Sequence, residues 1–313
     1  MNGLELSRAF WEEWGRPMLE ERFPALLPHL AAGLTGSGSE CFGYDDEVSR
    51  DHDFEPGFCL FLPGEDVVDR RSAFLLERAY AGLPREFRGF RRPLLLPVGG
   101  ARRGVLRIGE FMEEKTGSPE GQLTLAQWLT VPEQSLAEAV NGEIYFDNRG
   151  ELSRIREGLR YFPEDVRRKK LAGQLLLMAQ SGQYNYRRCL RHGETGAAQL
   201  AAAEFTGSAM SALFLLHRHY RPFYKWAFRA LRELPGEAAS AADLERILST
   251  GNGPGEAEEK ERLMEGIAAW VVEALLDQGL SRAGGSELED QAYALNQQVE
   301  DPQLRNMHIL AAV

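Results

Sequence analysis

Cysteine is scarce in this chain of 313 residues, which contains only Cys41, Cys59 and Cys189. The three are far apart in the sequence and form no Cys-x-x-Cys pair, so they argue against a disulfide framework and against a structural zinc site. An odd number of separated cysteines is typical of proteins of a reducing cytoplasm. We therefore predict a cytoplasmic protein without disulfides.

Basic residues are in deficit. The chain has 36 Lys and Arg against 47 Asp and Glu, a formal net charge of -11. Proteins that bind nucleic acids in general hold the phosphate backbone with a surplus of Lys and Arg, so this balance disfavours a nucleic-acid partner. One local concentration of arginines stands out, at positions 85, 88, 91, 92, 102, 103 and 107. Such a run favours a solvated face over a site for a triphosphate or an acidic partner.

Long apolar runs are also missing. Glu5, Glu12 and Glu13 interrupt the first residues, so the start of the chain does not read as a signal peptide. No later segment is expected to reach membrane-spanning length, which predicts no membrane partner. The 43% hydrophobic content is enough for ordinary cores, and 313 residues are long for one domain but comfortable for two.

The first half of the chain alternates between helical and strand patterns. Helices are expected over 4–23 and 66–83, and strands over 29–35, 52–62, 105–111 and 143–147. Strands and helices that share one sheet predict an α/β (α+β) domain with a small mixed sheet over residues 1–150.

After Gly150 the pattern becomes helical, with helix starts marked by Pro163, Glu194, Pro222 and Ser240. Residues 249–260 are rich in Gly, Pro and Glu and are expected to form an exposed connection between helices. The sequence predicts an all-α helical bundle domain over residues 151–313.

Two aspartates alternate along the strand expected over 52–62 and its approach. Because side chains alternate faces along a strand, Asp51 and Asp53 point the same way while His52 points to the other side. Carboxylate oxygens are the ligands that Mg²⁺ prefers, and substrate phosphates usually complete its coordination. The pair is therefore sufficient to hold Mg²⁺ with a triphosphate.

A Gly-Ser turn precedes these aspartates. Without Cβ atoms, Gly36 and Gly38 let backbone N–H groups approach phosphate oxygens, and the Ser37 hydroxyl adds a hydrogen bond. Gly38-Ser39 offers an alternative register for the same turn. Gly36-Ser37 is preferred because it follows the expected apolar strand directly.

This Gly-Ser turn and the Asp51-x-Asp53 strand together resemble the active-site signature of the nucleotidyltransferase superfamily, which has a polymerase-beta-like fold. The likeness is closest to an uncharacterised bacterial group that carries Gly-Ser-Gly-Ser-Glu followed by Ser-Arg-Asp-His-Asp. Similarities continue through residues 141–147 and 219–226. The resemblance implies Ser37 near the triphosphate, Asp51 and Asp53 as metal ligands, and two Mg²⁺ (or Mn²⁺) ions.

Active relatives carry a third carboxylate on a later strand. We place Glu110 slightly ahead of Asp147 for this role, with Glu143 as a further alternative. Such a group would accept the acceptor's proton or position a metal. The spacing of residues 107–110 matches the family pattern only approximately.

Two cationic residues are candidate nucleotide contacts. Arg50, beside the strand entrance, can contact phosphate oxygens bidentately or neutralise nearby acidic residues. Lys225 is the candidate from the helical half. Tyr220, Tyr224 and Trp226 can stack on a base, although aromatic residues around a helix break are more often core.

The resemblance therefore predicts a Mg-dependent nucleotidyltransferase that transfers a nucleoside monophosphate, AMP in the first instance, from ATP or another NTP to a hydroxyl of a small molecule or protein. The alternative is a catalytically inactive nucleotide-binding protein that keeps the fold. A phosphohydrolase is a third class, disfavoured because the sequence shows no second histidine cluster beside His52. The sequence does not indicate the acceptor or the oligomeric state.

Overall fold

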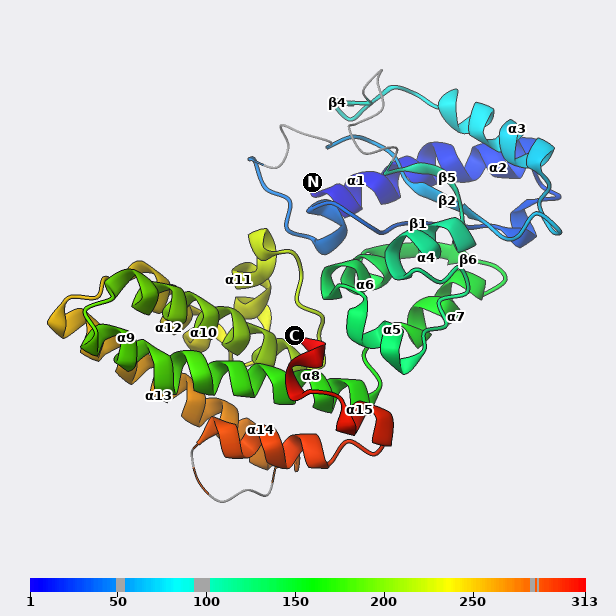
Figure 1. Cartoon of the computed structure of the whole chain (residues 1–313). Coiled ribbons are helices and arrows are strands. Elements are labelled where there is room, and N and C mark those ends of the chain that lie inside the picture. The colour runs from blue at the N-terminus through cyan, green and yellow to red at the C-terminus, as the bar shows by residue number, and fades with distance from the viewer. Residues whose placement is uncertain (49–53, 93–101, 282–284, 286) are drawn as a thin grey trace. The chain divides into compact units, whose positions relative to one another are not determined.

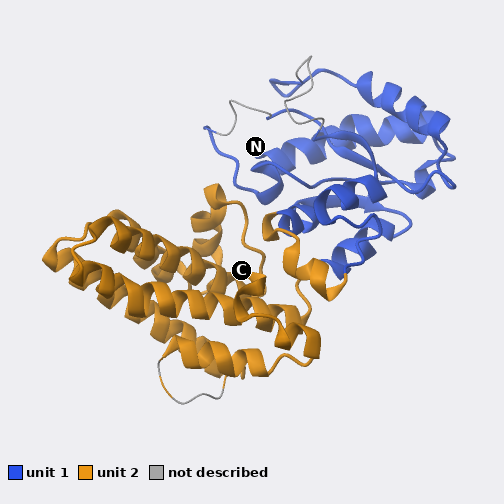
Figure 2. Ribbon diagram, viewed as in Figure 1, with its two compact units in different colours: residues 1–123, 135–160 blue, residues 124–134, 161–313 orange. Residues whose placement is uncertain are grey.

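The computed structural model describes residues 1–48, 54–92, 102–281, 285 and 287–313 (Figure 1). The chain forms two compact units, one of residues 1–123 and 135–160 and the other of residues 124–134 and 161–313 (Figure 2). The predicted boundary follows Gly150, whereas the first unit ends at Arg160. A short segment that precedes the boundary, 124–134, also belongs to the second unit.

A small mixed sheet forms the centre of the first unit. Its strands are β1 (Ala31–Leu34), β2 (Cys59–Leu62), β5 (Gly104–Arg107) and β6 (Glu143–Asp147), in the order β5-β2-β1-β6. Strand β1 runs antiparallel to β2 and β6, whereas β2 and β5 are parallel. A separate ribbon pairs β3 (Glu86–Phe87) with β4 (Phe90–Arg91). The predicted combination of helices with a small mixed sheet is confirmed.

The remaining elements of the first unit are helical. They are α1 (Gly3–Phe10), η1 (Trp11–Gly15), α2 (Arg16–Arg22), η2 (Leu27–His29), η3 (Glu40–Phe42), α3 (Arg70–Ala81), α4 (Ile108–Thr116), α6 (Glu133–Val140, whose first two residues belong to the second unit) and α7 (Glu151–Gly158). The helix expected over 4–23 is confirmed, with a π-helical turn at η1. Gly15 closes this turn, where a Cβ atom would lie 2.5 Å from the Phe58 ring.

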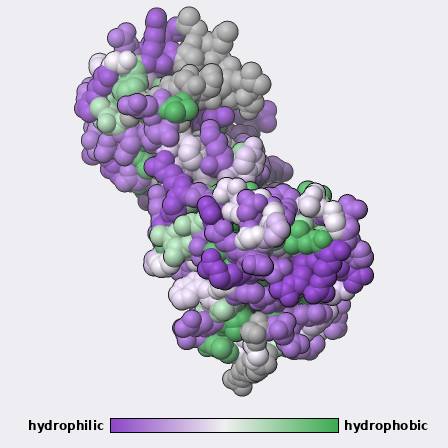
Figure 3. All heavy atoms as spheres, turned by 90° about the vertical axis from the view of Figure 1, so that its left-hand side faces the viewer, coloured by the Kyte–Doolittle hydropathy of each residue, from purple (hydrophilic) through white to green (hydrophobic). Residues whose placement is uncertain are grey.

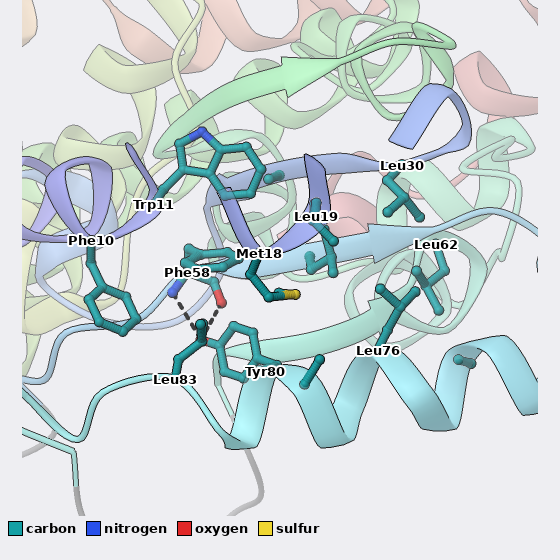
Figure 4. Close-up of a cluster of buried hydrophobic side chains, with 14 of the residues drawn as sticks. Phe10, Trp11, Met18, Leu19, Leu30, Phe58, Leu62, Leu76, Tyr80 and Leu83 are labelled. Atoms are coloured by element: carbon teal, nitrogen blue, oxygen red, sulfur yellow. Dashed lines mark hydrogen bonds between the residues drawn. The ribbon is translucent and has the colours of Figure 1, made fainter. Parts of the chain in front are cut away.

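A hydrophobic cluster joins the N-terminal helices to one face of the sheet and to α3 (Figure 4). Phe58, which precedes β2, is fully buried in it and stacks edge-to-face on Tyr80, with ring centroids 5.0 Å apart. The Tyr80 hydroxyl accepts a hydrogen bond from Phe58 N at 3.0 Å and donates one to Phe58 O at 2.7 Å. Burial raises the pKa of Tyr80 to about 12, so this buried hydroxyl stays neutral and satisfies both backbone groups.

All three cysteines are free, as predicted. Cys41 and Cys59 are buried, and burial raises the pKa of Cys59 to about 11 and that of Cys41 well above its usual value. The thiolate is the reactive species, so the native protein should react rapidly with Ellman's reagent at one thiol, the partly exposed Cys189. All three should react in denaturant. Rapid release of more than one equivalent of thionitrobenzoate from the native protein would contradict this assignment.

The second unit is built from helices, as predicted for the second half of the chain. They are α5 (Leu125–Thr130), α8 (Glu164–Met178), η5 (Ala179–Tyr186), α9 (Arg187–Arg191), α10 (Thr195–Leu216), α11 (Tyr224–Glu233), α12 (Ala238–Ser249), α13 (Pro254–Asp277), α14 (Leu288–Gln297), α15 (Pro302–Asn306) and η6 (Ile309–Ala312). The buried Arg167 of α8 donates to the carbonyl oxygens of Leu215 (2.9 Å) and Leu216 (3.3 Å). It thereby satisfies the end of α10.

Helix α10 corrects the expectation that no segment reaches membrane-spanning length. Among the described residues, it is the one helix long and apolar enough to cross a membrane. However, 67% of its most apolar window is buried inside the protein, as in the core helix of a soluble protein. On the face drawn in Figure 3, hydrophilic residues dominate and hydrophobic ones form small separate patches.

The connection expected over 249–260 is also shorter than predicted. Helix α13 begins at Pro254, because proline is well suited to the first helical position. Lys260 is fully buried, and its Nζ donates to Gln199 Oε1 at 2.6 Å and to Asn252 Oδ1 at 2.9 Å. The segment 249–260 has the composition of an exposed loop, yet its second half forms the first two turns of a packed helix.

Candidate functional site

The Gly-Ser turn directly follows β1, as predicted. Gly36 and Gly38 have φ angles of +110° and +124°, which residues with a Cβ atom rarely adopt. Ser39 ends the turn, and its carbonyl oxygen accepts from Phe42 N (3.1 Å) and Tyr44 N (2.8 Å), so η3 follows immediately. Gly36 is buried, whereas Ser37 and the two residues after it are partly exposed.

Three consecutive backbone donors of the turn are unused. Within the described part of the chain, the N–H groups of Ser37, Gly38 and Ser39 donate no hydrogen bond. Successive N–H groups around a left-handed residue form a concave anion-binding nest. The N–H of Gly36, by contrast, is not available for a phosphate, because it donates to Asn141 Oδ1 at 2.9 Å.

Asn141 holds the start of the turn in place. Its Nδ2 donates to Gly36 O at 2.8 Å, and its Oδ1 also accepts from Thr35 Oγ1 at 3.1 Å. Arg156 donates to Thr35 Oγ1 at 2.7 Å and to the carbonyl oxygens of Val140 and Asn141, at 3.0 and 2.7 Å. Burial lowers the pKa of Arg156 to about 10, so it remains charged at neutral pH. These contacts make the base of the turn rigid.

A lysine and a glutamate meet the Ser37 hydroxyl. Lys115 Nζ lies 3.2 Å from Ser37 Oγ and 2.8 Å from Glu138 Oε2, and Ser37 Oγ donates to the same Glu138 oxygen at 2.9 Å. The Lys115 side chain is only 9% exposed. Burial alone lowers the pKa of Lys115, but hydrogen bonds to Glu114 and Glu138 outweigh it and raise that pKa. The turn therefore has a permanent cation at its hydroxyl.

A buried ion pair supports the turn from within the unit. Glu40 Oε1 lies 2.8 Å from Arg103 Nη2, and both side chains are less than a tenth exposed, at 8% and 5%. Arg103 also donates to Glu55 O. Burial alone lowers the pKa of Arg103, but the negative charges of Glu40 and Glu55 keep it raised. This arginine, part of the concentration read as a solvated face, is in fact a core residue.

Gly38 approaches this ion pair closely. A Cβ atom at Gly38 would lie 2.5 Å from Glu40 Oε1, an atom that Arg103 holds in place. We expect Gly38→Ala to lower the free energy of unfolding by about 2–4 kcal/mol, because backbone strain and overpacking add. Gly43→Ala is the matched control, since Gly43 has a φ of +71° but no atom near its Cβ position. Urea unfolding of both variants checks this prediction. An equal loss of unfolding free energy in the two variants would contradict the close contact at Gly38.

Strand register places the turn at one edge of the sheet. Gly33 pairs with Cys59, so β1 ends where β2 begins, and the chain reaches β2 from residues 54–58. The residues proposed to hold metal and phosphate, Asp51, Asp53 and Arg50, lie outside the described residues. Their roles stay predictions, but β2 itself begins at the edge that carries the turn.

Glu110, predicted as the third carboxylate, lies on a helix and not on the expected strand. Strand β5 ends at Arg107, and Glu110 lies exposed in the first turn of α4, so the expected strand over 105–111 is too long. Arg107 pairs with Leu62, the last residue of β2, which puts this end of β5 at the edge opposite the turn. The strand placement of Glu110 is therefore wrong.

The two alternatives also have structural partners. Asp147 pairs with Ala31 at the edge opposite the turn, and its Oδ2 accepts from Ser153 N at 2.8 Å. Glu143 pairs with Leu34 at the same edge as the turn. Its Oε2 accepts from Arg8 Nε at 3.1 Å, so this carboxylate is neutralised.

The aromatic and cationic candidates of the second unit differ in their exposure to solvent. Tyr220 is buried and packs edge-to-face on Phe162, with ring centroids 4.9 Å apart, which confirms the core interpretation. Tyr224, in contrast, is 73% exposed. Lys225 is exposed on α11, with Nζ 4.9 Å from the centroid of the Trp226 ring. Its contact with a nucleotide stays a prediction.

Sequence reasoning missed Lys115, Glu138 and the role of Asn141. Lys115 and Glu138 lie 78 and 101 residues from Ser37, and no local pattern marks either of them. One signal was available beside Asn141. A Cβ atom at Gly142 would lie 1.9 Å from Leu34 O, so this glycine reports the close approach of the segment to β1.

The described residues around the turn form no metal site of their own. Within the described ranges there is no group of three His, Cys, Asp or Glu side chains that could hold a metal. The carboxylates near the turn are each engaged: Glu40 by Arg103, Glu138 by Lys115 and Glu143 by Arg8. Mg²⁺ needs only one or two carboxylates besides phosphates and water, so the prediction that Asp51 and Asp53 hold it requires no further carboxylate from the described residues.

Comparison with known protein families gave one match, over part of the chain. Residues 128–227 match the family model "Domain of unknown function (DUF4037)". This is about a third of the chain, and it includes Glu138 and Asn141 as well as helices α8 to α10. Neither the search of curated proteins nor that of solved structures gave a match.

Proposed function

We propose that this protein is a Mg-dependent nucleotidyltransferase that transfers AMP from ATP to a hydroxyl of a small molecule or a protein. One observation carries the proposal. Three unused backbone donors, at Ser37, Gly38 and Ser39, belong to a turn whose Ser37 hydroxyl contacts the Lys115 ammonium, at the edge where β2 begins. Such a group of donors and a cation is suited to bind the non-bridging oxygens of a polyphosphate.

The sheet supports the same fold as the resemblance. In the nucleotidyltransferase signature, a Gly-Ser turn follows one strand and the Asp-x-Asp pair begins the next. Here β1 precedes the turn, β2 follows Asp51 and Asp53 in the chain, and the two strands are antiparallel neighbours. This topology supports a meeting of the turn and the two aspartates at one edge of the sheet.

In this mechanism the turn binds and orients the triphosphate. The three N–H groups donate to phosphate oxygens and Lys115 neutralises their charge, while the Ser37 hydroxyl turns from Glu138 to donate to a phosphate oxygen. Bound at Asp51 and Asp53, Mg²⁺ would supply charge stabilisation to the attacking and leaving oxygens. Glu138 holds Lys115 and Ser37 before the nucleotide arrives, so the site is preorganised at little cost in side-chain entropy.

A second candidate function is nucleotide binding without transfer. The structure offers a specific reason for it, since Glu40, Glu138 and Glu143 all pair with a cation. None of these three carboxylates is left to activate an acceptor hydroxyl. A protein with a phosphate nest and metal ligands but no such base would bind ATP and release it unchanged.

The test separates binding from transfer. The full chain is titrated with a non-hydrolysable ATP analogue and Mg²⁺ by calorimetry, and is then incubated with α-labelled ATP and a cell extract. We expect saturable binding, labelled adducts detected by mass spectrometry and release of pyrophosphate, all lost with EDTA. Binding without adducts would favour the second candidate, and absence of binding would overturn both.

Lys115 provides the test within the described site. Lys115→Met should weaken binding of the ATP analogue by about tenfold to a hundredfold, because a charge-assisted contact to phosphate is lost. Arg70→Met is the control, since Arg70 pairs with Glu65 on the surface of the same unit, with the arginine side chain 84% exposed. Unchanged affinity in Lys115→Met would place the phosphates elsewhere.

A further inference from the structure

The second unit contains a pocket that the proposed function does not use. Its volume is about 400 Å³, within the range of small-molecule sites. Its walls come from the segment before and at the start of α6, from α10, and from the chain that leads into α11. The lining residues are Pro132, Glu133, Gln134, Ser211, Arg221, Pro222, Phe223 and Tyr224. All of these residues belong to the second unit. Residues 132–134 come from its short segment, and the others come from its long segment.

Two opposite charges face this pocket without pairing directly. Arg221 and Glu133 both line it, and the Arg221 backbone N–H donates to Glu133 Oε2 at 3.1 Å. The Arg221 side chain turns to other partners, with Nη1 donating to Gly207 O at 3.0 Å and to Ser211 Oγ at 2.8 Å. The guanidinium is thus held by the backbone and hydroxyl of α10 and forms no ion pair with a described carboxylate.

Each of the two charges keeps unused capacity. Among the hydrogen bonds of the described residues, none involves Glu133 Oε1 or the Nε and Nη2 groups of Arg221. A guanidinium presents these N–H groups as a planar fork that fits a carboxylate or phosphate. A carboxylate oxygen accepts from an amine or hydroxyl.

The surroundings make these charges costly when the pocket is empty. Burial raises the pKa of Glu133, against the opposing charges of Lys170 and Arg221, and it lowers the pKa of Arg221, against Glu133. Lys170, the other charge near Glu133, donates to the carbonyl oxygens of Leu129 (3.4 Å) and Ala312 (3.3 Å). A ligand with two matching charges would therefore satisfy groups that the fold leaves poorly compensated.

Two aromatic rings complete the pocket. Phe223 and Tyr224 are 43% and 73% exposed, unusual values for large aromatic side chains. Their ring centroids lie 4.3 Å apart, and the buried Pro222 fixes the chain just before them. Exposed aromatic rings beside polar groups are typical of sites for a flat apolar group.

We propose that this pocket binds a zwitterionic small molecule with a flat apolar group, of which an aromatic α-amino acid is the simplest form. Its carboxylate binds the free fork of Arg221, its ammonium group donates to Glu133 Oε1, and its ring packs against Phe223 and Tyr224. This pocket shares no residue with the phosphate site at Ser37.

Three matched probes test this assignment by calorimetry on the full chain. They are L-phenylalanine, 3-phenylpropanoate, which lacks the amine, and 2-phenylethylamine, which lacks the carboxylate. We expect L-phenylalanine to bind at least tenfold more tightly than either analogue. L-Alanine, which lacks the ring, should bind more weakly as well. If L-phenylalanine does not bind at about 10 mM, a concentration that detects even weak sites, or binds no better than both analogues, the proposal is overturned.

Variants locate the binding. Arg221→Gln should weaken L-phenylalanine at least tenfold and leave 2-phenylethylamine unchanged, whereas Glu133→Gln should weaken L-phenylalanine and leave 3-phenylpropanoate unchanged. Arg187→Gln, at an exposed arginine paired with Glu261, should keep full affinity. If Arg221→Gln does not fold, Arg221→Lys, which keeps the charge but not the fork, should show the same loss for L-phenylalanine. Unchanged affinity in Glu133→Gln and in the Arg221 variant would place the ligand elsewhere.

Discussion

Replacement of Asp51 or Asp53 by asparagine should reduce nucleotidyl transfer by about a thousandfold or more. A bound metal is worth several kcal/mol of transition-state stabilisation, and each 1.4 kcal/mol corresponds to roughly a factor of ten in rate. Asparagine has nearly the same shape as aspartate but no charge, so it removes the metal ligand while changing packing little. The rate of formation of the labelled adduct, measured at saturating ATP and Mg²⁺, is the quantity to compare.

The control for this prediction is Asp277→Asn, because Asp277 is exposed at the end of α13 in the second unit. Thermal unfolding of each variant verifies that the fold is kept. In both variants, ATP binding should also no longer depend on Mg²⁺. If both variants transferred AMP at more than a tenth of the original rate, the metal site would have to be built from other residues.

Replacement of Arg103 by methionine should lower the free energy of unfolding by about 3–5 kcal/mol, because removing one partner of a buried ion pair leaves an uncompensated charge. The charge left behind is that of Glu40, whose side chain is 8% exposed. The double variant Arg103→Met with Glu40→Met should recover much of this loss, since a buried pair can often be replaced by apolar residues at little cost. Urea unfolding gives the free energy of unfolding of the unmodified protein, the single variant and the double variant.

A surface ion pair supplies the comparison for this second prediction. Arg70 and Glu65 form an ion pair whose side chains are 84% and 49% exposed. Removal of such a pair should cost well under 1 kcal/mol, because water screens both charges. A loss of similar size in Arg103→Met would show that Glu40 reaches water, and the turn would then not depend on the pair.

Several elements could be predicted because their signals are local. The apolar stripe of the N-terminal helix, the short apolar strand β1 and strand β6 depend on periodicity alone. The helical second half could be recognised by its helix starts, such as Pro163 before α8 and Glu194 before α10.

Helix α4 shows where local signals fail. Residues 105–111 combine β-branched and aromatic residues with one glycine, a composition typical of a strand. The strand nevertheless ends at Arg107, whose guanidinium donates to Pro63 O at 2.8 Å and to Val68 O at 3.1 Å. These long-range contacts hold the chain where it leaves the sheet, and the helix that follows carries Lys115 to Ser37.

For the candidate site, the sequence alone determined the Gly-Ser turn, because glycines at positive φ and a serine beside them are a property of four consecutive residues. Tertiary structure decided which groups that turn meets. Lys115, Glu138 and Asn141 reach it across 78 to 105 residues of chain. Strand register likewise put Asp147, and the end of β5 that precedes Glu110, at the opposite edge. Such contacts depend on how strands pair and helices pack, and the chemistry of a single segment does not encode them.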